Sequence, residues 1–152
     1  MLIRSTRFGE IEVPEDEIIN FPYGLPGFME EKAFAFLPCE GDNPFAFLQS
    51  VTEPNLTFIV VEPFGFFKEY EFELNDQIAS ELGLDEENPP QILNIVSMPG
   101  NPETMTANLL APVIINVQSR RAVQFVLEKT SYTTKHPLFP EGFLQQPDKG
   151  GK

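Results

Sequence analysis

Few side chains in this sequence could perform chemistry: one histidine, one cysteine and a run of carboxylates. His136 precedes Pro137, and a lone imidazole needs partner groups before it can shuttle protons or bind a metal. We therefore interpret His136 as a turn residue. Cys39 lies beside Glu40 and Asp42, and their negative charge disfavours the thiolate that a nucleophile requires.

The sequence lacks the spacing patterns of nucleophile elbows, zinc proteases, phosphate-binding loops and dinucleotide-binding turns. Asp42 and Asn43 beside Gly41 offer too few oxygen ligands for a calcium loop. A single cysteine excludes an internal disulfide and any site built from several cysteines. We therefore expect no catalytic residue, no metal and no cofactor.

The carboxylates gather in residues 62–87, where nine acidic residues accompany one basic residue, Lys68. Alternation in 70–74 predicts a strand with Tyr70, Phe72 and Leu74 inward, so that Glu69, Glu71 and Glu73 share the outer face. Such a face could dock a basic partner, or it could be an ordinary solvated face that discourages edge pairing. A glycosidase is disfavoured, because adjacent solvated acids lack the distinct environments that its two carboxyl groups need.

Two aromatic residues, Phe66 and Phe67, precede these acids. Adjacent residues on a strand point to opposite faces, so one of them would face solvent as an apolar anchor for a partner. The alternative is that both belong to the core. The candidate partner-binding residues are Phe66, Phe67, Glu69, Glu71 and Glu73.

The whole chain has 152 residues and a formal net charge of −13. Phosphate backbones repel such a surface, so direct nucleic-acid binding is not expected, whereas a basic protein partner would be attracted. The sequence shows neither a secretion signal nor an apolar run of about 20 residues. We expect a cytoplasmic protein without membrane contact, monomeric when free, with one domain over residues 1–144 and a flexible tail over 145–152.

Fifteen prolines and ten glycines divide the chain into short segments, and fifteen phenylalanines with no tryptophan predict a core rich in Phe. One short helix is expected between the N-cap Asn75 and the stop Gly83. About ten strands predict an all-β fold with a minor α component, a small antiparallel barrel-like or sandwich body. Their expected positions are 2–8, 11–13, 18–21, 34–37, 45–51, 56–61, 70–74, 91–98, 113–117 and 123–127.

The last two of these strands should form a hairpin. Pairing Val117 with Val123 leaves residues 119–121 as its loop, buries one face and leaves the other face, with Asn116, Gln118 and Gln124, solvated. The six apolar residues of the buried face are Val113, Ile115, Val117, Val123, Phe125 and Leu127.

Three sequence blocks carry a resemblance to a known family. They are Gly-Leu-Pro-Gly-Phe at 24–28, Asn-Leu-Leu-Ala-Pro-Val-Ile-Ile-Asn at 108–116, and the ending with Gln124, Tyr132 and His136-Pro-Leu at 136–138. In this order they resemble the FliW flagellar assembly factor family over about residues 2–143. The sequence departs from that pattern at residues 121–122, Arg-Ala, where many members are expected to carry a glycine.

The resemblance implies a barrel-like protein without catalysis that binds two partners in turn. These are newly made flagellin and the RNA-binding translational regulator CsrA, whose repression of flagellin translation a FliW-like protein relieves. The residues leave two alternatives open. One is a small-molecule-binding barrel, or an enzyme that uses the barrel mouth. The other is a purely structural subunit, which a stable monomer would argue against.

Overall fold

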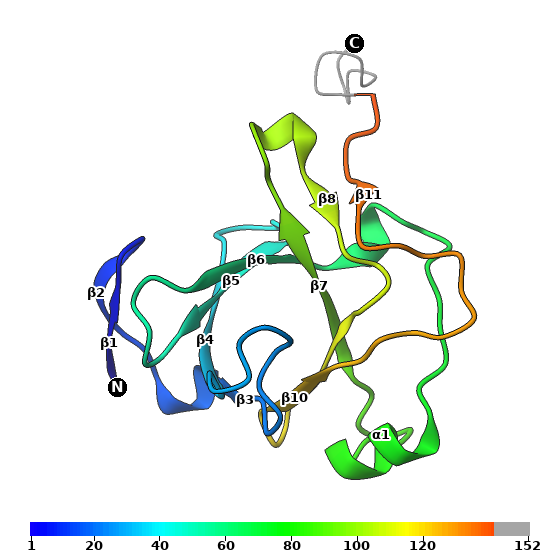
Figure 1. The fold of residues 1–152 in the computed structure, drawn as a ribbon. Helices are drawn as coiled ribbons and strands as arrows, with labels where there is room; N and C mark the ends of the chain where they lie inside the picture. The colour runs from blue at the N-terminus through cyan, green and yellow to red at the C-terminus, as the bar shows by residue number, and fades with distance from the viewer. Residues whose placement is uncertain (142–152) are drawn as a thin grey trace.

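The computed structural model describes residues 1–141, and a closed β-barrel forms the centre of this part of the chain (Figure 1). Strand β7 closes it, because residues 91–93 pair with β9 and residues 94–96 pair with β6. One α-helix, α1 (Asp76–Leu82), lies at the bottom of the view. This architecture confirms the predicted fold class. The barrel strands are β3 (Ile18–Asn20), β4 (Ala33–Pro38), β5 (Phe45–Ser50), β6 (Thr57–Val61), β7 (Gln91–Ser97), β9 (Val113–Asn116) and β10 (Arg121–Gln124).

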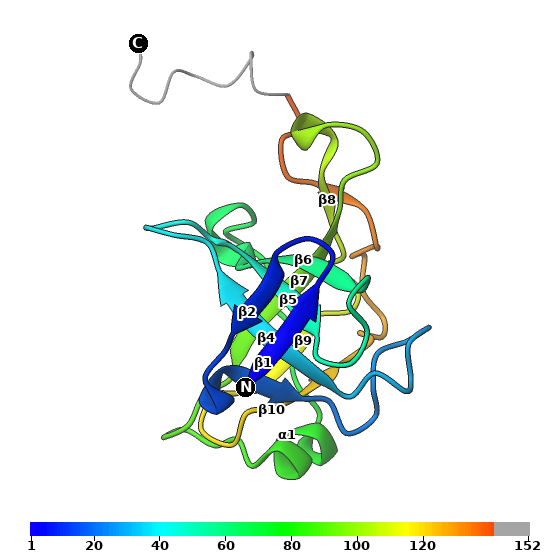
Figure 2. The same ribbon diagram turned by 90° about the vertical axis from the view of Figure 1, so that its left-hand side faces the viewer.

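Four short strands lie outside the barrel. β1 (Leu2–Ser5) and β2 (Gly9–Glu12) form a separate hairpin, which faces the viewer in Figure 2. β8 (Thr106–Ala107) pairs with the far end of β7, and β11 (His136–Pro137) pairs with β8. Together these last strands extend the sheet beyond the barrel. Three 3-10 turns complete the described elements: Glu15–Glu17, Pro63–Gly65 and Pro102–Thr104.

Apolar side chains fill the barrel interior. Phe21, Phe34 and Leu48 are fully buried there. They belong to one cluster with residues of β3, β6, β7, β9 and β10. The side chains of this cluster occupy the space between the barrel strands. The buried members of this core are Ile19, Phe21, Leu25, Phe34, Ala46, Leu48, Val60, Leu93, Val113, Ile115 and Ala122.

A second core lies on the outside of the barrel wall. It includes Tyr70, Val96 and Leu109, and partly buried aromatic side chains of residues 66–72 and 132–139 pack against it. Residues 66–72, which form no regular secondary structure, and residues 132–139, which include β11, therefore cover β7 and β8. Phenylalanine side chains occur in both cores, as predicted from the composition.

The predicted helix is confirmed together with both of its ends. The side chain of Asn75 accepts a hydrogen bond of 2.8 Å from the N–H of Ile78, and Gly83 ends the helix at φ 73°. A short helix of this kind is marginal in isolation. It is held by contacts to the β9–β10 hairpin, described below.

The predicted register of that hairpin is wrong. Arg121 pairs with Asn116, and Val123 pairs with Ile114, so the turn spans residues 117–120 and Val117 is exposed. The oxygen of the Asn116 side chain accepts hydrogen bonds from the N–H groups of Gln118 and Ser119, which closes the turn earlier than expected. The expectation of one solvated face is also wrong, because β9 is buried on both faces.

Candidate partner-binding surface

Residues 62–75 connect β6 to α1 across the outside of the barrel (Figure 1). The strand predicted at 70–74 is not formed, because these residues pair with no strand. Residues 91–93 of the adjacent strand β7 pair with β9 and residues 94–96 pair with β6, whereas residues 70–74 pack on this wall through the side chains of Tyr70 and Phe72. The predicted alternation of side chains nevertheless holds: Tyr70 is buried, Phe72 and Leu74 are half-buried, and Glu69, Glu71 and Glu73 are exposed.

Tyr70 fixes this segment to the barrel. Its hydroxyl donates a 2.7 Å hydrogen bond to the carbonyl oxygen of Leu109, and its oxygen accepts one of 3.3 Å from the side-chain amide of Asn94. Burial raises the pKa of Tyr70 to about 12, because the phenolate would lose its water. The ring packs edge-on against Tyr132 at 4.8 Å between centroids, and the Tyr132 oxygen accepts a hydrogen bond from the N–H of Glu71.

The two candidate anchors, Phe66 and Phe67, are both half-buried. Phe66 contacts Phe45 at 5.8 Å and Phe139 at 5.7 Å between ring centroids, and Phe67 contacts His136 at 6.0 Å. Their inner faces belong to the second core, and their outer faces remain accessible.

The more exposed aromatic residue nearby is Phe64, at 48%. The sequence analysis missed Phe64. Its position directly after Pro63 was the available signal, because proline ends the buried strand and turns the next side chain outward.

His136 and Cys39, the histidine and the cysteine of the sequence, lie in different parts of the fold. The ring nitrogen Nε2 of His136 accepts a 2.8 Å hydrogen bond from the N–H of Thr133, which occupies it as a local structural contact. Cys39 is a partly buried free thiol in the turn after β4. Within residues 1–141, no group of three His, Cys, Asp or Glu side chains is placed to hold a metal ion.

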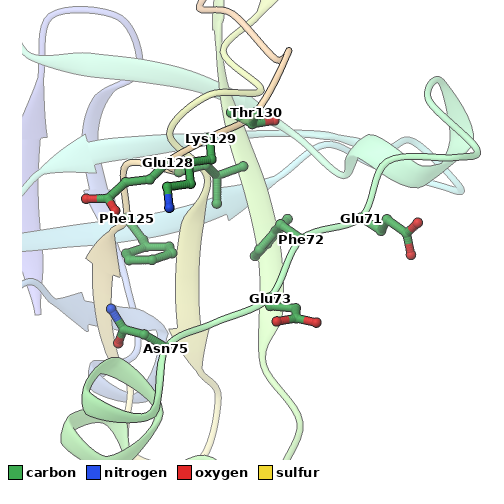
Figure 3. Close-up of a pocket in the computed structure, with 9 residues that line it drawn as sticks. Glu71, Phe72, Glu73, Asn75, Phe125, Glu128, Lys129 and Thr130 are labelled. Atoms are coloured by element: carbon green, nitrogen blue, oxygen red, sulfur yellow. The ribbon is translucent and has the colours of Figure 1, made fainter.

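A surface pocket of about 430 Å³ lies between the acidic segment and the chain that follows β10 (Figure 3). Phe72 faces it from one wall and Phe125 from the other, while Glu71 and Glu73 point away from Phe125 (Figure 3). Lys129, at φ 55°, lines the second wall. From the sequence, Phe125 is predicted on the buried face of the hairpin, and its proximity to the acids is not predicted. The complete lining is Glu71, Phe72, Glu73, Asn75, Phe125, Leu127, Glu128, Lys129 and Thr130.

The structure thus brings the five candidate residues onto one side of the barrel. Acidic side chains at 69, 71 and 73 are exposed beside half-buried aromatic rings, and Lys68 is the single base between residues 62 and 87. A charged rim around apolar anchors is the composition of many protein-binding surfaces. Among residues 1–141, no helix is both long and apolar enough to cross a membrane.

Comparisons with known proteins agree with this architecture. The model of the FliW protein family matches residues 2–138. A flagellar assembly factor FliW of Desulfitobacterium hafniense is 49% identical over 152 residues, which cover 100% of both chains. The FliW of Bacillus subtilis is 48% identical over 138 residues, covering 91% of this chain and 96% of the relative.

A solved structure leads to the same assignment. The crystal structure of a flagellar assembly factor FliW superposes with a TM-score of 0.84 at 42% identity, and the match covers 93% of this chain and 99% of the other. The fold is therefore shared along nearly the whole length of the two chains. This chain belongs to the FliW family of flagellar assembly factors.

Proposed function

We propose that this flagellar assembly factor is a partner-switching regulator that binds CsrA and flagellin in turn. Free protein binds CsrA and relieves its repression of flagellin translation. Unsecreted flagellin then captures the protein and releases CsrA. The protein performs no reaction in this cycle, and it works in the cytoplasm, where flagellin is made.

The exposed acids of the 69–73 segment are the observation that carries this proposal. Glu69, Glu71 and Glu73 stand on one side of a chain of net charge −13. An RNA-binding protein must present positive charge to its RNA, so complementary potentials favour its encounter with this face. The half-buried rings of Phe66 and Phe67 provide apolar contact beside the charges.

The test is the titration of purified CsrA against a variant in which Glu69, Glu71 and Glu73 are replaced by Lys. We expect the affinity to fall by at least about tenfold at low salt, and the loss to shrink as salt screens the charges. Unchanged affinity at low salt would remove this face from the interface.

A matched control carries the same change in charge on the opposite side of the barrel. Glu10, Glu15 and Asp16 are exposed near the β1–β2 hairpin, and their replacement by Lys alters net charge equally. We expect the control to weaken CsrA binding much less.

The switching step is tested by adding flagellin to the preformed complex. We expect flagellin to release CsrA, and a size measurement to show a monomer of the free protein. A stable ternary complex would contradict binding in turn.

A further inference from the structure

The acidic segment presents an unpaired stretch of extended backbone. Between Glu71 and the cap of α1, the N–H groups of Phe72, Glu73 and Leu74 make no hydrogen bond to any residue from 1 to 141. Backbone donors and acceptors are strong hydrogen-bonding groups that need a partner. An unpaired extended edge is a template on which another strand can add.

The neighbouring pocket gives such a strand a place for its side chains. Phe72 and Phe125 face the 430 Å³ space from opposite walls, and Leu127 also lines it (Figure 3). The volume lies within the range of about 300 to 1,000 Å³ that is typical of ligand sites. Its lining is mixed, and an apolar side chain of an added strand would contact Phe72, Phe125 and Leu127 within it.

The acidic side chains around the pocket favour basic residues in the added strand. Glu71 and Glu73 are exposed on the face opposite Phe72, and Glu128 lies at the second wall beside Lys129. In a paired strand, side chains alternate between the two faces, and opposite charges directly across a pair are favourable. A strand added here would place apolar side chains at the pocket and basic side chains against Glu71 and Glu73.

We propose that residues 71–74 bind an extended segment of a partner protein in which apolar and basic residues alternate, by strand addition to this edge. This inference rests on the proposed function, since it assigns a binding mode to part of the same surface. Affinity comes from backbone hydrogen bonds, and selectivity comes from the pocket and the acids.

The experiment uses the full chain and a synthetic peptide of sequence Lys-Val-Lys-Val-Lys with blocked ends. Amide hydrogen exchange of Phe72, Glu73 and Leu74 is measured by NMR with and without the peptide. We expect exchange of at least one of these amides to slow by about tenfold or more at saturation. Peptide binding that leaves all three amides unprotected would overturn the inference.

Two modified peptides separate strand addition from simple charge attraction. A shuffled peptide, Val-Val-Lys-Lys-Lys, keeps the composition and loses the alternation. Peptides methylated at alternate backbone nitrogens keep every charge but lose half of the donors. We expect the shuffled peptide and one of the two methylation patterns to bind at least about tenfold more weakly. Equal affinity of all the peptides would also overturn the inference.

A variant pair tests the acids. Replacing Glu71 and Glu73 by Gln should lower the affinity for the alternating peptide. Replacing Glu10 and Glu15 by Gln should leave that affinity unchanged. The peptide experiments and the CsrA titration can fail independently, so they distinguish strand addition from the proposed function. Loss of CsrA binding in the Lys variant without amide protection by the peptide would leave the regulator role standing and refute strand addition.

Discussion

The hydroxyl of Tyr70 donates a 2.7 Å hydrogen bond to the carbonyl oxygen of Leu109, and this contact ties the acidic segment to the wall of the barrel. The two residues are 39 positions apart in the sequence, and both are buried. Residues 69–73 have no strand pairing, so this hydrogen bond anchors them to the barrel. The acids at 69, 71 and 73 therefore have defined positions.

Replacing Tyr70 by Phe should destabilise the protein by about 1–3 kcal/mol, because the carbonyl of Leu109 and the amide of Asn94 would both lose a buried partner. Urea unfolding measures the change. Tyr23→Phe is the control, since the Tyr23 hydroxyl bonds to Glu81 at the exposed surface. Its effect should stay within about 0.5 kcal/mol.

The same tyrosine makes stability depend on alkaline pH. Its pKa rises from 10.0 to about 12 on folding, so the folded state favours the neutral phenol. The contribution of the neutral Tyr70 side chain to the free energy of unfolding is therefore fully present below pH 10, and it is lost as the pH rises towards 12. The free-energy difference between the natural protein and Tyr70→Phe should narrow over this range. Tyrosinate absorbance should show a late step that disappears in the variant.

Asn116 joins the hairpin turn to the helix. Its side-chain amide donates to the carbonyl oxygen of Leu82, the last residue of α1, and its oxygen holds the turn. Asn116→Ala should cost about 1–3 kcal/mol and speed amide exchange in α1. Asn20→Ala, at an exposed position of β3, is the control. Unchanged exchange in α1 would show that the helix does not depend on this contact.

Gly24 tests the packing of the 21–31 loop. It adopts φ +68°, and a Cβ there would collide with the carbonyl oxygen of Met29, whereas Gly9 at φ +77° has open space around it. Gly9→Ala should cost about 1 kcal/mol for its backbone conformation alone. Gly24→Ala should cost roughly 1–3 kcal/mol more, because the loop backbone must shift. Thermal unfolding of the two variants compares them directly, and equal losses would contradict the collision.

Arg120 occupies a left-handed conformation at φ 58°. This is the hairpin loop in which the family resemblance leads us to expect a glycine close by. Arg120→Gly and Arg120→Ala both lose the ion pair with Glu17, which is 3.9 Å long. The Gly variant should therefore be more stable than the Ala variant by about 1 kcal/mol, and chemical denaturation of both isolates the backbone cost. A more stable Ala variant would contradict the assigned conformation.

The sequence was sufficient to predict features that depend on residues close together in the chain. Asn75 and Gly83 defined both ends of α1, because an N-cap and a left-handed stop act within one turn of the helix. Alternation also identified which side chains of 70–74 face outward. The frequent prolines, glycines and alternating segments indicated an all-β body, and the sequence blocks at 24–28, 108–116 and 124–138 indicated the family that the comparisons show.

Tertiary contacts decided what lies between distant segments. Residues 70–74 form no strand pairing although their side chains alternate, and Asn116 of the hairpin bonds to the carbonyl oxygen of Leu82, 34 residues away. No period along the chain encodes either fact. The pocket likewise exists only because barrel closure brings Phe72 opposite Phe125. The sequence alone determined the types and faces of the side chains, and the closed sheet determined which of them meet.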